Sequence, residues 1–169
     1  MNKKIIYTLS LLLILMLTIS GMKHLFIEDI KQVAISNNVE GFNDYLLDLG
    51  RNKLTLPIGW SLKENPYNIE KTDVTFNNGS NINGKIIIVD GELEDYIKKY
   101  NNLSSEVVNL EGSNYNWKVV YKKEEENVTK YYLTQYSEGK VLIIEYSYDK
   151  RSIKNSMEIV FDKISDSFE

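Results

Sequence analysis

The sequence predicts an α+β fold: a mostly antiparallel sheet of six to seven strands flanked by helices, preceded by an N-terminal transmembrane helix. Three observations lead to this prediction. The chain begins with a long uncharged stretch, apolar residues alternate with period two from Leu54 onward, and segments 92–101 and 151–168 have helical spacing. Consecutive strands with helices set apart from them are typical of the α+β class.

The uncharged stretch comprises the 18 residues 5–22, with two lysines before it and Lys23 and His24 after it. As a helix it spans about 27 Å, close to the hydrocarbon thickness of a bilayer. We expect an uncleaved membrane anchor; the alternative is a signal peptide, whose apolar region is usually about 7–15 residues, and its cleavage would make the domain secreted. Because more lysines precede the stretch than follow it, residues 1–4 are expected in the cytoplasm and the C-terminal domain outside.

Residues 23–53 are predicted to form a helical stalk or linker. Asn37-Asn38 and Gly41 interrupt the pattern, so two helical pieces with a break are expected, and Gly50 is placed as a helix stop. The stalk either lifts the domain off the bilayer or packs against it. The apolar residues with helical spacing are Ile30, Val33, Ala34, Phe42, Tyr45, Leu46 and Leu49.

Residues 54–169 are predicted to form the extracytoplasmic α+β domain. Asn78-Gly79 is typical of a tight turn, and the charged segment 122–126 is expected at the tip of a hairpin. The helices predicted at 92–101 and 151–168 each carry an apolar stripe that would pack on the sheet. Strands are predicted at 54–60, 73–77, 84–90, 106–111, 114–122, 127–136 and 140–148.

The order of these elements resembles the PsbP-like superfamily over residues 54–168. The matching segments are LPIGWS (56–61), VTFN (74–77), KIIIVD (85–90), LEDYIKKY (93–100), GKVLIIEYSY (139–148) and SDSF (165–168). The resemblance implies a central antiparallel sheet with helices on its faces, but no single activity. Some eukaryotic members bind a small GTPase, photosynthetic members assist photosystem II, and bacterial anchored members resemble binding or assembly modules. No functional residue of the family carries over by position, and the anchor and residues 25–53 depart from the family pattern.

Composition excludes several function classes. The chain has no cysteine, which excludes disulfides, thiolate metal sites, cysteine nucleophiles and lipoprotein acylation. From Leu25 onward 17 basic residues face 24 acidic ones, a net charge of −7 that disfavours nucleic-acid binding. His24, the one histidine, lies beside the predicted span, outside any pocket of the folded domain. With no phosphate-binding loop pattern either, we expect no catalytic residue, cofactor or metal site.

Carboxylates are the remaining source of chemistry. Glu92, Glu94 and Asp95 lie near a predicted helix N-terminus, where acidic side chains favour the helix dipole. Glu124–Glu126 are expected at a solvated hairpin tip. A glycosidase needs two carboxylates that converge in a pocket, and sequence alone leaves such a pair open.

Aromatic side chains are the candidates for a partner-binding surface. Trp60 and Trp117 are expected in the core, with partner binding as the alternative. Five tyrosines lie on neighbouring predicted strands, and because side chains alternate between the faces of a strand, only some of them can point inward. An exposed row would contact a protein or a glycan. These tyrosines are Tyr131, Tyr132, Tyr136, Tyr146 and Tyr148.

These observations favour a membrane-anchored, non-catalytic binding or assembly module of a bacterial cell envelope. Its partners would be the membrane, through residues 5–22, and an envelope protein or surface component. One alternative is a carboxylate-dependent enzyme that acts on a glycan. Another is a structural envelope protein related to stress or sporulation that acts by self-association. Converging acids in a cleft would favour the enzyme, and a flat aromatic patch would favour the binding module.

Overall fold

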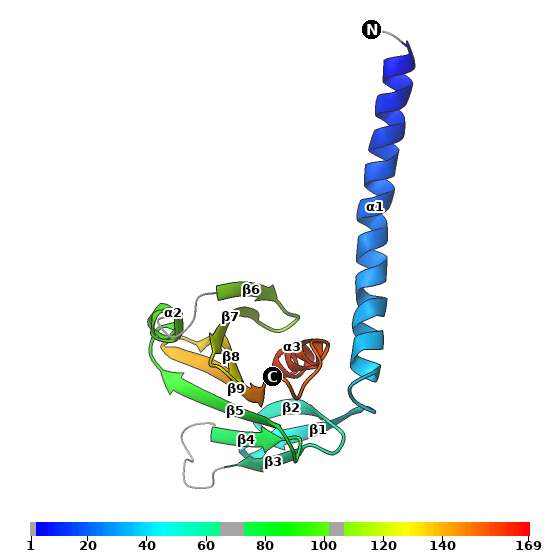
Figure 1. Ribbon diagram of the computed structural model, residues 1–169. Coiled ribbons are helices and arrows are strands. Elements are labelled where there is room, and N and C mark those ends of the chain that lie inside the picture. Colours follow the sequence, from blue (N-terminus) through cyan, green and yellow to red (C-terminus); the bar gives the residue numbers. More distant parts are fainter. Residues whose placement is uncertain (1–2, 65–72, 102–106) are drawn as a thin grey trace.

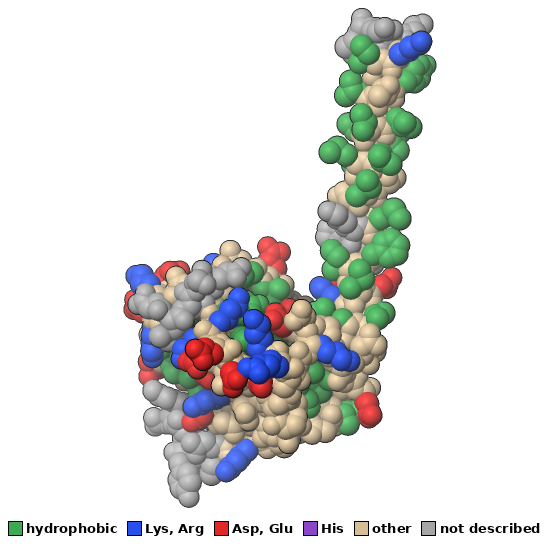
Figure 2. Space-filling model, viewed as in Figure 1, with side chains coloured by type: hydrophobic (Ala, Val, Ile, Leu, Met, Phe, Trp, Pro, Cys, Tyr) green, Lys and Arg blue, Asp and Glu red, His purple; other side chains and the backbone are tan. Residues whose placement is uncertain are grey.

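Figure 1 shows the computed structural model, which describes residues 3–64, 73–101 and 107–169. A long N-terminal helix, α1 (Lys3–Ser36), stands away from an α+β domain and meets it only at its last turns. The helix is long and apolar enough to cross a membrane, and none of its most apolar window is buried. Figure 2 shows apolar side chains along the length of the helix.

The predicted stalk is helical only in its first part. Helix α1 ends at Ser36, beside the predicted break, and Ile35 enters the core with 9% exposure. The Asn38 side chain donates hydrogen bonds to the Ala34 carbonyl (2.6 Å) and to Ser156 Oγ (2.9 Å). The end of α1 is thereby tied to the domain.

The helix predicted after residue 41 is wrong. The segment forms strand β1 (Phe42–Leu47), the 3-10 turn η1 (Asp48–Gly50) and strand β2 (Asn52–Pro57), and β1 and β2 pair antiparallel. Four apolar residues fit a helical stripe by spacing, but here Leu47 is fully buried while Leu46 is 70% exposed, as expected on a strand. Gly50 has a φ of 86° and belongs to the hairpin turn rather than to a helix end.

The main sheet has seven strands in the order β3-β4-β5-β9-β8-β7-β6, and all neighbours are antiparallel. This confirms the predicted fold class. The strand predicted at 54–60 is divided instead: β2 ends at Pro57, and Gly59, with a φ of 86°, turns the chain into the main sheet. The strands are β3 (Ser61–Glu64), β4 (Asp73–Asn77), β5 (Ile82–Asp90), β6 (Val107–Glu111), β7 (Asn116–Lys123), β8 (Asn127–Ser137) and β9 (Lys140–Asp149).

Two helices pack on opposite faces of this sheet (Figure 1). Helix α2 (Leu93–Asn101) covers one face, and α3 (Met157–Asp166) covers the other, where the β1–β2 hairpin and the end of α1 also lie. Helix α3 begins later than predicted, because residues 151–156 form turns that start at Asp149, whose side chain accepts a hydrogen bond from the Arg151 amide. The larger part of the core lies between the sheet and α3.

Candidate binding site

The aromatic candidates lie in the core rather than in an exposed row. All are buried except Tyr136, which is half-buried. Tyr132, Tyr146 and Tyr148 face α3, whereas Tyr131 faces α2 and stacks on Tyr100 with ring centroids 4.3 Å apart. The other buried candidates are Trp60 and Trp117. Their first role is therefore packing, and only Tyr148 among them also lines the cleft described below.

The tyrosines under α3 use their hydroxyl groups within the core. The Tyr146 ring stacks on Phe161 at 4.4 Å between centroids. Its hydroxyl lies 2.9 Å from Ser165 Oγ and donates to the Phe161 carbonyl oxygen at 3.2 Å. A buried phenol needs such partners, because an unpaired polar group in an apolar core is costly. These contacts fix α3 against β9.

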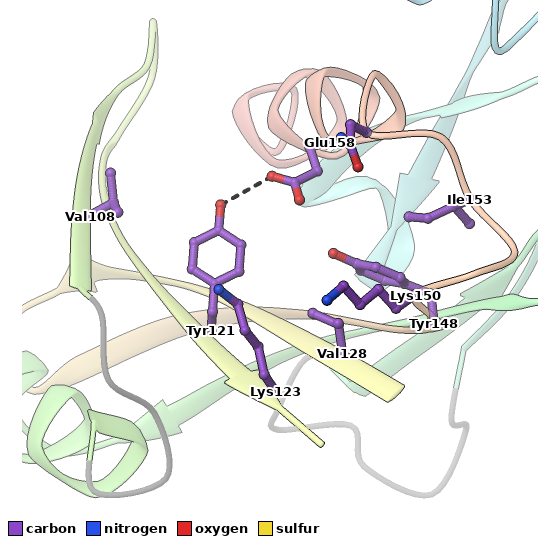
Figure 3. Close-up of a pocket in the computed structure, with 9 residues that line it drawn as sticks. Val108, Tyr121, Lys123, Val128, Tyr148, Lys150, Ile153 and Glu158 are labelled. Carbon is purple, nitrogen blue, oxygen red and sulfur yellow. Dashed lines mark hydrogen bonds between the residues drawn. The ribbon is translucent and has the colours of Figure 1, made fainter. Parts of the chain in front are cut away.

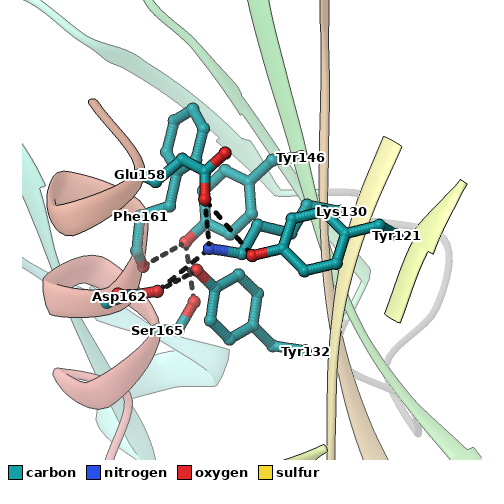
Figure 4. Close-up of polar contacts among 8 residues, drawn as sticks. All are labelled: Tyr121, Lys130, Tyr132, Tyr146, Glu158, Phe161, Asp162 and Ser165. Atoms are coloured by element: carbon teal, nitrogen blue, oxygen red, sulfur yellow. Dashed lines mark hydrogen bonds and ion pairs between the residues drawn. The ribbon is translucent and has the colours of Figure 1, made fainter. Parts of the chain in front are cut away.

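A buried lysine joins the same helix to β8 (Figure 4). Lys130 is 2% exposed, and its ammonium lies 3.1 Å from Asp162 Oδ1 and 3.6 Å from Glu158 Oε2. The ammonium also lies 4.8 Å from the centroid of the Tyr132 ring and 5.3 Å from that of Tyr121. Two carboxylates one helical turn apart and two aromatic faces thus surround one cation.

Two tyrosine hydroxyls complete this network. Tyr132 donates to Asp162, and Tyr121 donates to Glu158 Oε2 at 3.2 Å. Burial, followed by the nearby Asp162 carboxylate, raises the pKa of Tyr132 well above 10.0. Burial and the Glu158 charge raise the pKa of Tyr121 as well. Both phenols therefore stay protonated at neutral pH and act as hydrogen-bond donors to the acids.

A cleft of about 320 Å³ opens beside this network (Figure 3). It is lined by residues of β6, β7, β8, the end of β9, the following turns and α3. Apolar and aromatic side chains form its walls, and the ammonium groups of Lys123 and Lys150 lie over the space between Tyr121 and Tyr148. Glu158 belongs to both the cleft and the network, so the two are continuous. The lining residues are Val108, Tyr121, Lys123, Val128, Tyr148, Lys150, Ile153, Asn155 and Glu158.

Of the carboxylates singled out in the sequence, those of α2 lie on the opposite face of the sheet from this cleft. The hairpin tip borders the cleft, and the Glu126 carbonyl accepts a hydrogen bond from the Lys150 amide at 3.0 Å. Glu94 and Asp95 are in the first turn of α2, and Glu92 precedes that helix, as expected for acidic side chains that favour the helix dipole. At the hairpin tip, Glu124 pairs with a lysine at 2.6 Å and Glu126 pairs with an arginine. Among the described residues, no group of three His, Cys, Asp or Glu side chains could hold a metal ion.

The arrangement of acids at the cleft does not suit glycoside hydrolysis. Glu158 and Asp162 lie on one face of a single helix, and both are paired with the buried Lys130. A glycosidase places its two carboxyl groups on either side of a sugar bond, about 5–9.5 Å apart. Within the part of the chain that the structure describes, the acids of this network instead offset the charge of a lysine.

Sequence reasoning missed this network, although one signal was present. Val128, Lys130 and Tyr132 are alternate residues of one predicted strand and therefore share one face of it. When Val128 and Tyr132 point into the core, Lys130 is buried with them. Glu158 and Asp162, at i and i+4 of the closing helix, supply the matching charges. An inward lysine on a strand and an acidic pair on the apolar side of a helix together predict a buried ion pair.

Comparison with known proteins shows the fold alone. No protein-family model matches the chain, and no curated protein matches it by sequence. The solution structure of cyanobacterial PsbP (CyanoP) from Synechocystis sp. PCC 6803 matches with a TM-score of 0.53 and 13% identity, covering 78% of this chain and 94% of that one. The structure of a point mutant of the protein Mog1 matches with a TM-score of 0.53 and 9% identity, covering 76% of this chain and 95% of that one. The chain has a PsbP-like fold, which confirms the resemblance at that level.

Proposed function

We propose that this protein is a membrane-tethered, extracytoplasmic binding module, and that it binds an acidic, partly apolar segment of an envelope protein in the cleft beside α3. The observation that carries the proposal is the cleft itself, which combines aromatic walls with two lysine ammonium groups. The PsbP-like fold supports a binding or assembly role, because the superfamily resemblance implies such modules.

The charges of the cleft define the class of ligand. The domain as a whole is acidic, yet Lys123 and Lys150 place two positive charges at this one opening. The Lys123 ammonium lies 5.7 Å from the centroid of the Tyr121 ring, and among the described residues the Lys150 ammonium has no carboxylate within ion-pair distance. A ligand carboxylate can therefore pair with the lysines while an apolar side chain packs on Tyr148 and Ile153.

The tether is supported by the exposed apolar helix. Residues 5–22 carry no charge, and their side chains are not covered by the domain. The lysines before this stretch favour the cytoplasmic side for the N-terminus and the outer side for the domain. N-terminal sequencing of the membrane-bound protein, with protease treatment of intact cells, tests both points. An intact N-terminus and a digested domain are expected; a mature chain that begins after the stretch would show a cleaved leader instead.

Photo-crosslinking in intact membranes tests the cleft. A photoreactive residue replaces Asn155, and the full-length chain is compared with the double variant Lys123→Glu/Lys150→Glu. We expect one partner, attached through an acidic peptide, and a loss of most of the crosslink in the variant, because like charges would then meet. The matched control is Lys98→Glu/Lys140→Glu, which changes the same charge at two exposed positions outside the cleft and should leave the crosslink intact. Equal crosslinking by all three proteins would contradict the proposal.

A further inference from the structure

Helix α1 carries a second apolar surface beyond the uncharged stretch. Phe26, Ile30 and Val33 are 53%, 62% and 59% exposed, although they follow the segment expected in the bilayer. At 3.6 residues per turn these three side chains lie within about 60° of one another around the helix axis. We refer to them as the outer stripe. Figure 2 shows apolar side chains continuing along this lower part of the helix toward the domain.

The domain does not cover the outer stripe. The residues of α1 that turn toward α3 and the β6–β7 turn are Glu28, Lys31, Gln32 and Ile35. Their average direction around the axis is roughly 180° from that of the outer stripe, given about 100° per residue. One side of α1 therefore lines a cleft against the domain and packs on it at Ile35, and the opposite side is apolar and open.

Lipid does not reach the whole stripe either. The rise of about 1.5 Å per residue puts Ile30 about 12 Å and Val33 about 16 Å beyond Met22, where the uncharged stretch ends. The headgroup region adds only about 5–8 Å on each side of the hydrocarbon core. With residues 5–22 in the bilayer, these two side chains lie above the lipid headgroups. Large apolar side chains held in water next to a membrane indicate a protein contact.

The spacing of the stripe matches a parallel coiled coil. Phe26, Ile30 and Val33 are separated by four and three residues, as alternate d and a positions of a heptad are. The same register continues into the uncharged stretch through Ile19, Met16 and Leu12. Lys23, which follows that stretch, is the one charged residue in this series. A single lysine at an a position lowers the stability of a coiled coil but specifies its register. In two parallel copies, Asp29 of one helix would face Ala34 of the other, so no like charges oppose each other across the stripe.

We infer that the outer stripe joins two copies of this chain in a parallel dimer. Two anchored copies share one membrane, one orientation and one height, so the same stripe on each meets its counterpart about a two-fold axis. A contact of three apolar layers is weak in water, but confinement in the membrane plane raises the effective concentration of the second copy. This inference rests on the tether of the proposed function and adds a partner to it; the domains stay on the outside of the helix pair, because they occupy the opposite side of α1.

Single-cysteine crosslinking tests the dimer, since the chain has no cysteine of its own. The full-length protein is expressed in membranes with one cysteine at a time from residue 26 to residue 33 and treated with a mild oxidant. We expect disulfide-linked dimers to peak at Phe26→Cys, Ile30→Cys and Val33→Cys. The matched controls Lys31→Cys and Gln32→Cys, which lie on the domain side at the same height, should crosslink several-fold less. Uniform crosslinking along the helix, or none at the three stripe positions, would overturn the inference.

A charge in the stripe separates this inference from the proposed function. Ile30→Glu places like charges across the two-fold axis and should abolish the crosslink of a second cysteine at residue 33, while the exposed position leaves the fold intact. The Asn155 photo-crosslink to the envelope partner should persist in this variant. If Ile30→Glu keeps both the disulfide at residue 33 and the Asn155 photo-crosslink, the dimer is refuted and the cleft is not. If the Asn155 photo-crosslink is lost only in Lys123→Glu/Lys150→Glu, the proposal for the cleft is still supported. A chain found to lack residues 5–22 refutes the tether and the dimer together.

Discussion

The two faces of the main sheet are built differently. The face under α3 holds most of the buried apolar residues, and α3 itself buries four side chains. The face under α2 holds a smaller set, and α2 has no fully buried residue. That smaller set consists of Val120, Tyr131, Leu133, Val141 and Ile143.

Polar groups differ between the faces as well. Under α3, hydroxyl groups and charges form a connected network around Lys130. Under α2, the half-buried Glu145 lies among tyrosines, and burial raises its pKa even though Lys85 and Lys122 act in the opposite direction. The comparison indicates that α3 holds the folded domain together, whereas α2 is a cover whose loss the domain tolerates better. The cleft lies at the edge of the more strongly packed face.

Removal of an aromatic ring under α3 should produce the largest effect. Phe161 is fully buried and stacks on Tyr146, so Phe161→Ala leaves a cavity and should lower the free energy of unfolding by about 3–5 kcal/mol. Urea denaturation followed by circular dichroism measures this loss. Ile97→Ala on α2 is the control and should cost much less, because Ile97 is only half-buried. Comparable losses of unfolding free energy in the two variants would show that the faces under α3 and α2 contribute equally to stability.

Removal of the buried charge should have an intermediate effect. Lys130→Met keeps the length of the side chain but leaves Asp162 and Glu158 without their cation, and we expect a loss of about 1–3 kcal/mol because these acids are more than a third exposed and partly solvated. A double-mutant cycle with Asp162→Asn measures the coupling between the two groups. Additive losses in that cycle would show that the ion pair is not what joins β8 to α3.

Truncation of the stacked tyrosine on α2 should cost less. Tyr100 stacks on Tyr131 at 4.3 Å between ring centroids, and Tyr100→Ala removes this contact from a half-buried site, so we expect a loss of about 1 kcal/mol. Tyr100→Phe keeps the stacked ring and serves as the control, with a stability close to that of the parent. If Tyr100→Ala loses as much unfolding free energy as Phe161→Ala, α2 contributes as much to the stability of the domain as α3 does.

Neutralising Glu145 should give the smallest effect and a distinct pH dependence. Because the folded-state pKa of Glu145 is raised, the native state binds its proton more readily, and stability from this group falls as pH rises through the unfolded and then the folded pKa. At neutral pH Glu145→Gln should therefore be more stable than the parent, by about 0.5 kcal/mol or less. The difference should shrink as the pH is lowered toward 4.5, as thermal unfolding at several pH values would show. A stability difference between Glu145→Gln and the parent that stays constant over this pH range would show that the charge of Glu145 does not cause it.

The sequence predicts the strands and helices of the main sheet well, because β5, β8 and β9 are rich in β-branched, aliphatic and aromatic residues and are bounded by turn residues. It fails at Phe42–Leu47, where four apolar residues fit both a helix and a strand, and only pairing with the distant β2 decides between them. Trp60 and Trp117 lie in the core as predicted. Which of the tyrosines are exposed could not be predicted, since burial depends on which sheet face α3 covers. Lys130 and its acids were missed because an ion pair across 28 and 32 residues of sequence needs the register of β8 against α3.

Helix α1 reaches Ser36 without interruption, and Asn38 then joins its end to α3. No flexible joint therefore separates residues 5–22 from the domain. Rotating residues 5–22 about the helix axis turns the cleft through the same angle. With the proposed tether in the bilayer, the orientation of that helix would therefore set the direction in which the cleft faces. One residue inserted between Met22 and Phe26 would re-aim the cleft by about 100° and raise it by only about 1.5 Å. In the proposed membrane-tethered protein, the number of residues in α1 would therefore change the direction in which the cleft faces far more than its distance from the bilayer.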